Sequence, residues 1–182
     1  MRFLISLVLV AACALAQSAP RNRLTFSGGW SHDVGSSSEQ ESATGLGLSY
    51  GYRVHNYVEA EAGLFTALDP TGDICSHNGC VDANDHFFWV PFGVRFIAPL
   101  AGGRIEFSVG GGGLYERHTA GNAGALPYSA WGGYFVGSAA VALDRSRHLW
   151  LGATPRLFLA NSGAVARDRW FQISAELSVR FR

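Results

Sequence analysis

The chain ends in Phe171-Gln-Ile-Ser-Ala-Glu-Leu-Ser-Val-Arg-Phe181-Arg182, in which apolar and polar side chains alternate without exception. A period of two residues is typical of a β-strand that has one apolar face and one polar face. This segment therefore predicts a strand with different surroundings on its two sides. The rest of the sequence indicates what those surroundings are.

Similar alternation recurs along the chain and predicts eight strands. They cover residues 22–32, 43–54, 57–67, 86–99, 104–117, 128–143, 148–159 and 170–181. Each has about the 9 to 11 residues, or slightly more, that a tilted strand needs to cross a bilayer. In segment 128–143 two apolar faces compete; we assign Trp131, Phe135, Val141 and Leu143 to the outward face, against Tyr134 and Val136.

The connections between these strands alternate in length. Short ones lie at residues 55–56, 100–103 and 144–147, and longer ones at 33–42, 68–85, 119–127 and 160–169. Short periplasmic turns that alternate with longer outer loops are typical of outer-membrane β-barrels, and an even number of strands places both chain ends on the periplasmic side. The pattern predicts an all-β, eight-stranded, antiparallel up-and-down barrel.

The first residues predict export. An apolar run from Phe3 to Leu15 and the small residues before Gln17 indicate a signal peptide at 1–16, which leaves residues 17–182 as one barrel domain. Val10-Ala-Ala-Cys13 offers an alternative, a lipoprotein cleavage box with a lipidated Cys13. The formal net charge is zero, which gives no support to a nucleic-acid partner.

The expected outward faces carry no charge in the clearest segments, such as 43–54, 86–99 and 148–159. A charge there would cost about 2 to 4 kcal/mol at the bilayer midplane, so its absence favours lipid as the neighbour. Aromatic side chains gather near segment ends, as in the girdles of membrane barrels. Trp89 and Trp150 fall instead on the inward phase and are expected to fill the lumen.

Charged residues within the strands fall mostly on the inward phase. Facing residues of a hairpin have a nearly constant sum of residue numbers, and this hairpin numbering predicts three pairs: Arg53 with Glu59, Arg95 with Glu106, and Arg156 with Glu176. The full set of predicted lumen charges is Arg53, Glu59, Glu61, Arg95, Glu106, Arg156, Glu176 and Arg180. All but Arg156 and Glu176 are expected in one layer near the periplasmic strand ends. Eight strands enclose a space only wide enough for side chains. We therefore favour a polar plug over a gate or proton path.

Cys75 and Cys80 flank Ser76-His-Asn-Gly79 in the longest loop. Two nearby cysteines in an exported loop predict a disulfide. A metal site that adds His77 and His86 is the alternative, but the spacing matches zinc motifs poorly. We predict no metal, no cofactor and no catalytic residue.

On these patterns the mature chain resembles the small outer-membrane β-barrels, that is, the OmpA transmembrane domain and OmpX-like proteins. The resemblance implies a monomer that contacts outer-membrane lipids and lipopolysaccharide and is inserted by the barrel-assembly machinery. It implies a structural or surface-interaction role, with loops 33–42 and 68–85 as contact surfaces for an unidentified extracellular partner. Arg182 departs from the pattern, because these barrels typically end on the aromatic residue itself.

Two alternatives stay open. Residues 156–163, Arg-Leu-Phe-Leu-Ala-Asn-Ser-Gly, resemble a stretch of PagL-type lipid A deacylase barrels. Leu159 stands where the resemblance requires the catalytic histidine and Asn161 where it requires the serine, so we expect no enzyme by that route; a relocated triad of Ser162 or another serine with a rim histidine stays open. The second alternative is a soluble, lipocalin-like barrel that binds a ligand in its lumen.

Overall fold

The computed structural model describes residues 20–35, 42–71, 73–76, 79–82, 85–120, 128–161 and 167–182. The predicted signal peptide and the alternative cleavage at Cys13 lie outside these residues. The strands are β1 (Asn22–Asp33), β2 (Ser42–His55), β3 (Val58–Thr71), β4 (Asp73–Ser76), β5 (Gly79–Asp82), β6 (Asp85–Leu100), β7 (Ile105–Ala120), β8 (Tyr128–Ala142), β9 (Leu149–Asn161) and β10 (Arg167–Phe181). A short 3-10 helix, η1 (Ala101–Gly103), joins β6 to β7.

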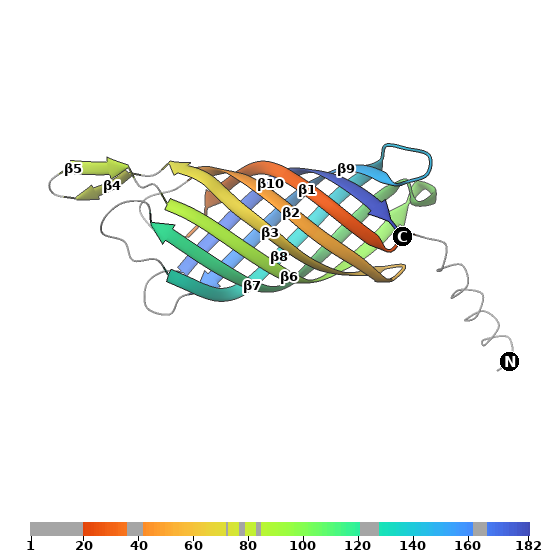
Figure 1. The fold of residues 1–182 in the computed structure, drawn as a ribbon, viewed down its shortest axis with the longest axis horizontal. Helices are drawn as coiled ribbons and strands as arrows, with labels where there is room; N and C mark the ends of the chain where they lie inside the picture. Colours follow the sequence, from red (N-terminus) through yellow and green to blue (C-terminus); the bar gives the residue numbers. More distant parts are fainter. Residues whose placement is uncertain are drawn as a thin grey trace, which may run out of the picture.

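Eight of the strands form a closed antiparallel barrel in the order β1-β10-β9-β8-β7-β6-β3-β2 (Figure 1). The seam between β1 and β10 pairs Asn22 with Phe181 and continues to Asp33 opposite Trp170. Closure pairs each barrel strand with a neighbour on both sides, so none of these eight strands forms an open sheet edge. The predicted fold class and the eight predicted strands are confirmed.

Strand boundaries differ from the sequence prediction mainly at one end of the barrel. β3 runs on to Thr71 and β10 begins at Arg167, both inside segments predicted as loops. The hairpin of β4 and β5 was not predicted at all, and it projects beyond the barrel in Figure 1. Its missed signal is Asn78-Gly79, a dipeptide that favours tight hairpin turns.

The two barrel ends are different. One, here called the turn end, carries the short connections after β2, β6 and β8 and the C-terminus; the other, the loop end, carries the β4–β5 hairpin (Figure 1). The turn at η1 uses positive φ angles at Ala101, Gly102 and Gly103 (50°, 67° and 78°), which glycine adopts without strain. This asymmetry between the ends agrees with the predicted alternation of connections.

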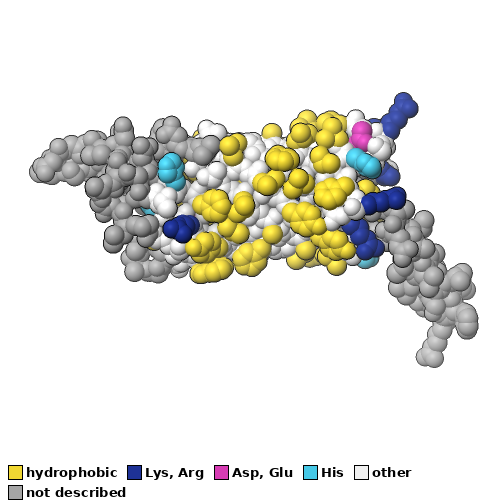
Figure 2. All heavy atoms as spheres, viewed as in Figure 1, with side chains coloured by type: hydrophobic (Ala, Val, Ile, Leu, Met, Phe, Trp, Pro, Cys, Tyr) yellow, Lys and Arg dark blue, Asp and Glu magenta, His cyan; other side chains and the backbone are white. Residues whose placement is uncertain are grey.

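Apolar side chains face outward around the barrel. Figure 2 shows them as a band over one face, with arginine and histidine toward the two ends. The assignment in β8 is confirmed, because Trp131 and Phe135 are 65% and 62% exposed whereas Tyr134 and Val136 are buried. No helix among the described residues is long and apolar enough to cross a membrane.

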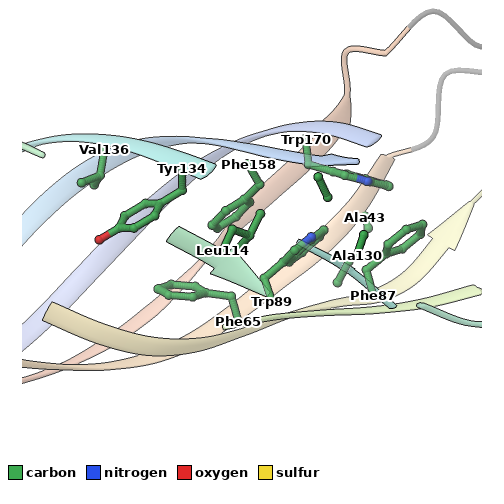
Figure 3. Close-up of a cluster of buried hydrophobic side chains, with 12 residues drawn as sticks. Ala43, Phe65, Phe87, Trp89, Leu114, Ala130, Tyr134, Val136, Phe158 and Trp170 are labelled. Carbon is green, nitrogen blue, oxygen red and sulfur yellow. The ribbon is translucent and has the colours of Figure 1, made fainter. Parts of the chain in front are cut away.

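The core lies inside the barrel. Trp89, Trp150 and Trp170 are almost completely buried, as the inward phase predicts for the first two. Trp89 stacks on Phe158 with ring centroids 5.0 Å apart and contacts Trp170 at 5.6 Å. Figure 3 shows the rings of Trp89, Phe158 and Trp170 with those of Phe65, Phe87 and Tyr134, converging from several strands into one apolar cluster.

Candidate functional site in the lumen

The lumen carries nearly all buried charge of the described chain. The buried arginine and glutamate side chains are Arg23, Glu59, Glu61, Arg95, Glu106, Glu116, Arg156, Glu176 and Arg180. They come from β1, β3, β6, β7, β9 and β10, each from the inward phase of its strand. Buried charges persist only when they are paired and hydrogen-bonded, so their partners define the site.

Four of these residues form a central network, which consists of Arg23, Glu59, Glu61 and Arg95. Arg95 Nε lies 2.6 Å from Glu61 Oε2, and Arg95 Nη2 donates to Glu61 Oε1 at 3.0 Å. Arg23 Nη2 lies 2.5 Å from Glu59 Oε1 and 3.4 Å from Glu61 Oε2. Glu61 therefore joins the two arginines, and the network balances two positive charges with two negative ones.

Gly51 makes the contact of Arg23 with β3 possible. It lies on β2, between β1 and β3, opposite Arg23 on one side and Glu61 on the other. A Cβ atom at this position would lie 2.4 Å from Glu59 Oε1. The missing side chain lets Arg23 reach across β2 to carboxylates two strands away.

A separate turn-end cluster consists of Arg53, Glu106 and Arg180. Arg180 Nη1 donates to Glu106 Oε1 at 2.9 Å, and Arg180 Nη2 pairs with Glu106 Oε2. Arg53 Nη2 lies 3.3 Å from each oxygen of the same carboxylate. The Arg180 guanidinium also lies 3.9 Å from the centroid of the Trp150 ring, within cation–π range.

Arg156 and Glu176 form the third charged group. Arg156 Nη2 pairs with Glu176, and Nη1 donates to Ser174 Oγ at 3.0 Å. The guanidinium lies 4.4 Å from the centroid of Phe65, so this pair contacts the apolar cluster. Another member of that cluster, Trp89, donates from Nε1 to the buried Glu116 Oε2 at 2.6 Å.

The structure corrects two of the three predicted pairs. Arg53 faces Glu59 in the register as predicted, but its guanidinium pairs with Glu106 while Glu59 pairs with Arg23. Arg95 faces Gly110, and Glu106 faces Pro99, so the predicted pair Arg95–Glu106 is wrong. The turn between β6 and β7 contains η1, and its centre lies further along the chain than the hairpin numbering assumed. The register of the two strands is shifted accordingly.

The third predicted pair, Arg156 with Glu176, is present, although Arg156 lies opposite Gln172 in the register, four residues before Glu176. The charges expected in one layer pair in two groups: Arg53, Glu106 and Arg180 pair with one another, while Glu59, Glu61 and Arg95 belong to the central network. Arg23 was missed. Its signal was its place on the inward phase of the first strand, but its partners lie two strands away and no hairpin numbering connects them.

The loop predictions are only partly covered by the structure. Cys75 and Cys80 are backbone partners in the β4–β5 hairpin, but their side chains and His77 lie outside the described residues. The disulfide therefore stays a prediction. Among the residues that the structure describes, no group of three or more histidine, cysteine or acidic side chains is placed to hold a metal ion.

Comparison with known proteins places the fold. No protein-family model matches the sequence, and neither does any curated protein. Neisserial surface protein A is similar in structure, with a TM-score of 0.69, 12% identity and coverage of 88% of this chain and 97% of that one. Ail of Yersinia pestis gives 0.60 with 9% identity (90% and 100% covered), and the outer membrane protein OprG of Pseudomonas aeruginosa gives 0.57 with 11% (90% and 96%).

At these identities the similarity concerns the fold. The chain has the closed, eight-stranded, all-antiparallel architecture of the small outer-membrane β-barrels. The resemblance read from the strand pattern is thereby confirmed at the level of the fold. What the neighbours do is not carried over to this chain by that likeness.

Proposed function

We propose that this protein is an outer-membrane β-barrel, closed by its own side chains, with a structural or surface-interaction role. The observation that carries the proposal is the sorting of side chains in the wall. Leu46, Leu48 and Tyr50 on β2 are 47%, 39% and 44% exposed, whereas the charges of the neighbouring strands point inward and are buried. A soluble barrel would need the reverse arrangement, because exposed apolar bands of this extent are unfavourable in water.

Two layers of side chains support a closed lumen. The apolar cluster around Trp89 and Phe158 lies toward the loop end, and the arginine and glutamate groups follow toward the turn end. An open pore would require these groups to separate, which leaves buried charges without partners. We infer that the barrel is a scaffold rather than an ion channel.

The surroundings follow from this placement. The apolar band contacts outer-membrane lipid, the turn end faces the periplasm and the loop end, with lipopolysaccharide around it, faces outward. The chain is a monomer inserted by the barrel-assembly machinery. Loops 33–42 and 68–85 would contact an extracellular partner, because functional contacts on rigid scaffolds concentrate in loops.

Cell fractionation tests the location, and planar-bilayer recording tests the closed lumen. We expect the protein in the outer-membrane fraction and, for the purified barrel, no steady conductance above that of the protein-free bilayer. Recovery in the soluble periplasm would support the lipocalin-like alternative. Binding of candidate extracellular partners to the intact protein, compared with variants in which one of the two loops is shortened, tests the contact surfaces.

A second candidate function, hydrolysis of an acyl ester, has one observation in its favour. His32 Nδ1 lies 2.9 Å from Ser42 Oγ at the loop end, on the outward phase of β1 and β2. The ring of His32 stacks on the exposed Trp30 at 5.1 Å, so the pair lies on the lipid side of the wall. A histidine that accepts the serine proton would activate the hydroxyl as a nucleophile.

Mass spectrometry of lipid A separates the two candidates. Our first proposal predicts that lipid A carries the same acyl chains in cells with and without the protein. It expects no deacylase activity of the PagL type, because Leu159 stands where that resemblance requires the catalytic histidine. Loss of an acyl chain with the wild-type protein but not with Ser42→Ala would establish the hydrolase. Threonine at position 42 keeps the hydroxyl and serves as the control.

A further inference from the structure

A pocket with an excess of positive charge opens at the turn end. Its volume is about 800 Å³, and its lining includes Arg53, Glu106, Arg147, His148, Arg180 and Arg182. Pro99, Leu100 and Tyr57 supply apolar wall. The residues come from β2, β6, β7, β10 and the turns between the strands, so the closed barrel alone brings them together.

The charges inside this pocket do not balance. In the central network two arginines meet two glutamates, but in the turn-end cluster Arg53 and Arg180 share the single carboxylate of Glu106. Arg147 adds a further guanidinium from the turn after β8, where it donates to the carbonyl of Gly102 at 3.0 Å. An anion in the pocket would neutralise this excess.

Arg180 is the most buried of the arginines that line the pocket. Its side chain is about nine-tenths buried and lines the pocket. Both Nη atoms bind Glu106, whereas its Nε is buried and makes no hydrogen bond within the part of the chain that the structure describes. The Nε atoms of Arg23 and Arg156 are likewise buried without a hydrogen bond to any described residue, so it is the cavity itself and its excess of positive charge that indicate a ligand.

We propose that the turn-end pocket binds a small organic anion with two or more negative charges, carried by phosphate or carboxylate groups. Guanidinium groups match the geometry of both through paired hydrogen bonds. The volume exceeds that of a bare phosphate and leaves room for a carbon skeleton against Leu100 and Tyr57. The proposal goes beyond the scaffold role and holds whichever way the barrel stands in the membrane.

Arg147 and Arg145 make a matched pair for the test. Both are exposed and lie in the turn after β8, but only Arg147 lines the pocket. Calorimetric titration of the folded barrel in uncharged detergent, with pyrophosphate in one arm and citrate in the other, measures binding. We expect saturable one-site binding that Arg147→Gln weakens about tenfold, since it removes one charge-assisted contact, while Arg145→Gln changes it less than about twofold.

Glu106→Gln is expected to act in the opposite direction. Removing the one carboxylate of the turn-end cluster should strengthen binding and make the anion raise the melting temperature more than it does in the wild type. The arm that binds more tightly identifies phosphate or carboxylate as the chemistry. No saturable binding in either arm, or equal weakening by the Arg145 and Arg147 variants, would overturn the proposal.

Discussion

At the scale of single residues, diagonal reach rather than direct opposition determines which charges pair in the lumen. Arg95 faces Glu59 across the β3–β6 ladder, yet it binds Glu61, two residues along the same strand. An arginine side chain is long enough to choose among several inward positions. Because removing one partner of a buried pair costs about 3 to 5 kcal/mol, the choice matters for stability.

The pair Arg95–Glu61 gives the first prediction. Arg95→Ala and Glu61→Ala should each destabilise the barrel strongly, because each leaves a buried charge without its partner. The double variant should lose less than the sum of the two, with a coupling of about 1 to 3 kcal/mol. Urea unfolding of the wild type, both single variants and the double variant in lipid vesicles measures this.

Glu106 supplies the control for that cycle. It lies in the turn-end cluster, where it binds Arg53 and Arg180, and hairpin numbering alone would have paired it with Arg95. Losses from Arg95→Ala and Glu106→Ala should add within about 0.5 kcal/mol. Additive losses for Arg95 with Glu61 would contradict the network described above.

At the scale of elements, the turn between β8 and β9 depends on one carboxylate. The Ser146 hydroxyl donates to Asp144, and so do the backbone N–H groups of Leu149 at 2.9 Å and His148 at 3.2 Å. These bonds favour the ionised form and hold the pKa of Asp144 well below its ordinary value, the Ser146 hydroxyl having the largest effect.

The second prediction follows from the sign of this shift. A lowered pKa in the folded state means that Asp144 stabilises the fold above its unfolded pKa of about 3.9. The contribution is lost as the pH falls from there toward the folded pKa. Wild-type protein should therefore be more stable than Asp144→Asn at pH 7, and the difference should shrink at pH 3. A difference that stays constant between the two pH values would show that ionisation of Asp144 is not involved.

The third prediction concerns the seam where the barrel closes. Gly29 and Gly28 are neighbours on β1, but a Cβ at Gly29 would lie 2.0 Å from the carbonyl oxygen of Ile173 on β10, whereas one at Gly28 would meet only Leu46 at 3.7 Å. Backbone cannot yield as a side chain can. Gly29→Ala should cost about 1 to 3 kcal/mol.

Gly28→Ala is the matched control and should change stability by less than about 0.5 kcal/mol. Urea unfolding compares the two variants under the same conditions. Equal losses of stability would mean that the close approach of β1 and β10 at Gly29 does not exclude a larger side chain there.

Elements were predictable to different degrees for physical reasons. The eight barrel strands follow from local information, because lipid and lumen impose a period of two on each strand independently. The charge pairs depend on the register of strands across the whole barrel, so an error of a few residues at η1 misplaced Arg95 and Glu106. The pairing of Arg23 could not be predicted from its own strand, because it depends on the missing side chain of Gly51 in the strand between Arg23 and its partners.

At the scale of the whole molecule, the protein has a polar interior and an apolar exterior. Its charges stabilise the fold only as balanced groups inside, and its apolar side chains stabilise it only if lipid surrounds the wall. Both halves of this arrangement have to form together, since a barrel that is not inserted exposes the band and a barrel that is not closed exposes the charges.

The last prediction tests the apolar band through its dependence on depth. Leu48 lies near the middle of β2 and Val54 near its turn end, and both face outward, 39% and 63% exposed. Leu48→Arg should lower the free energy of unfolding by about 2 to 4 kcal/mol, because it places a charge near the bilayer midplane. Val54→Arg should cost about 0 to 1 kcal/mol, because the charge reaches the interface.

Unfolding free energies of the two variants, measured in lipid vesicles of different thickness, distinguish a wall surrounded by lipid from a wall that stands in water. If lipid surrounds the wall, the penalty at position 48 depends on the thickness of the bilayer and exceeds that at position 54 in every case. A barrel that stands in water would treat both substitutions alike, since exposed arginine on a soluble surface changes stability by no more than about 0.5 kcal/mol. Equal, small effects at the two positions would therefore contradict the proposed membrane location. They would not contradict the closed barrel or its charge network.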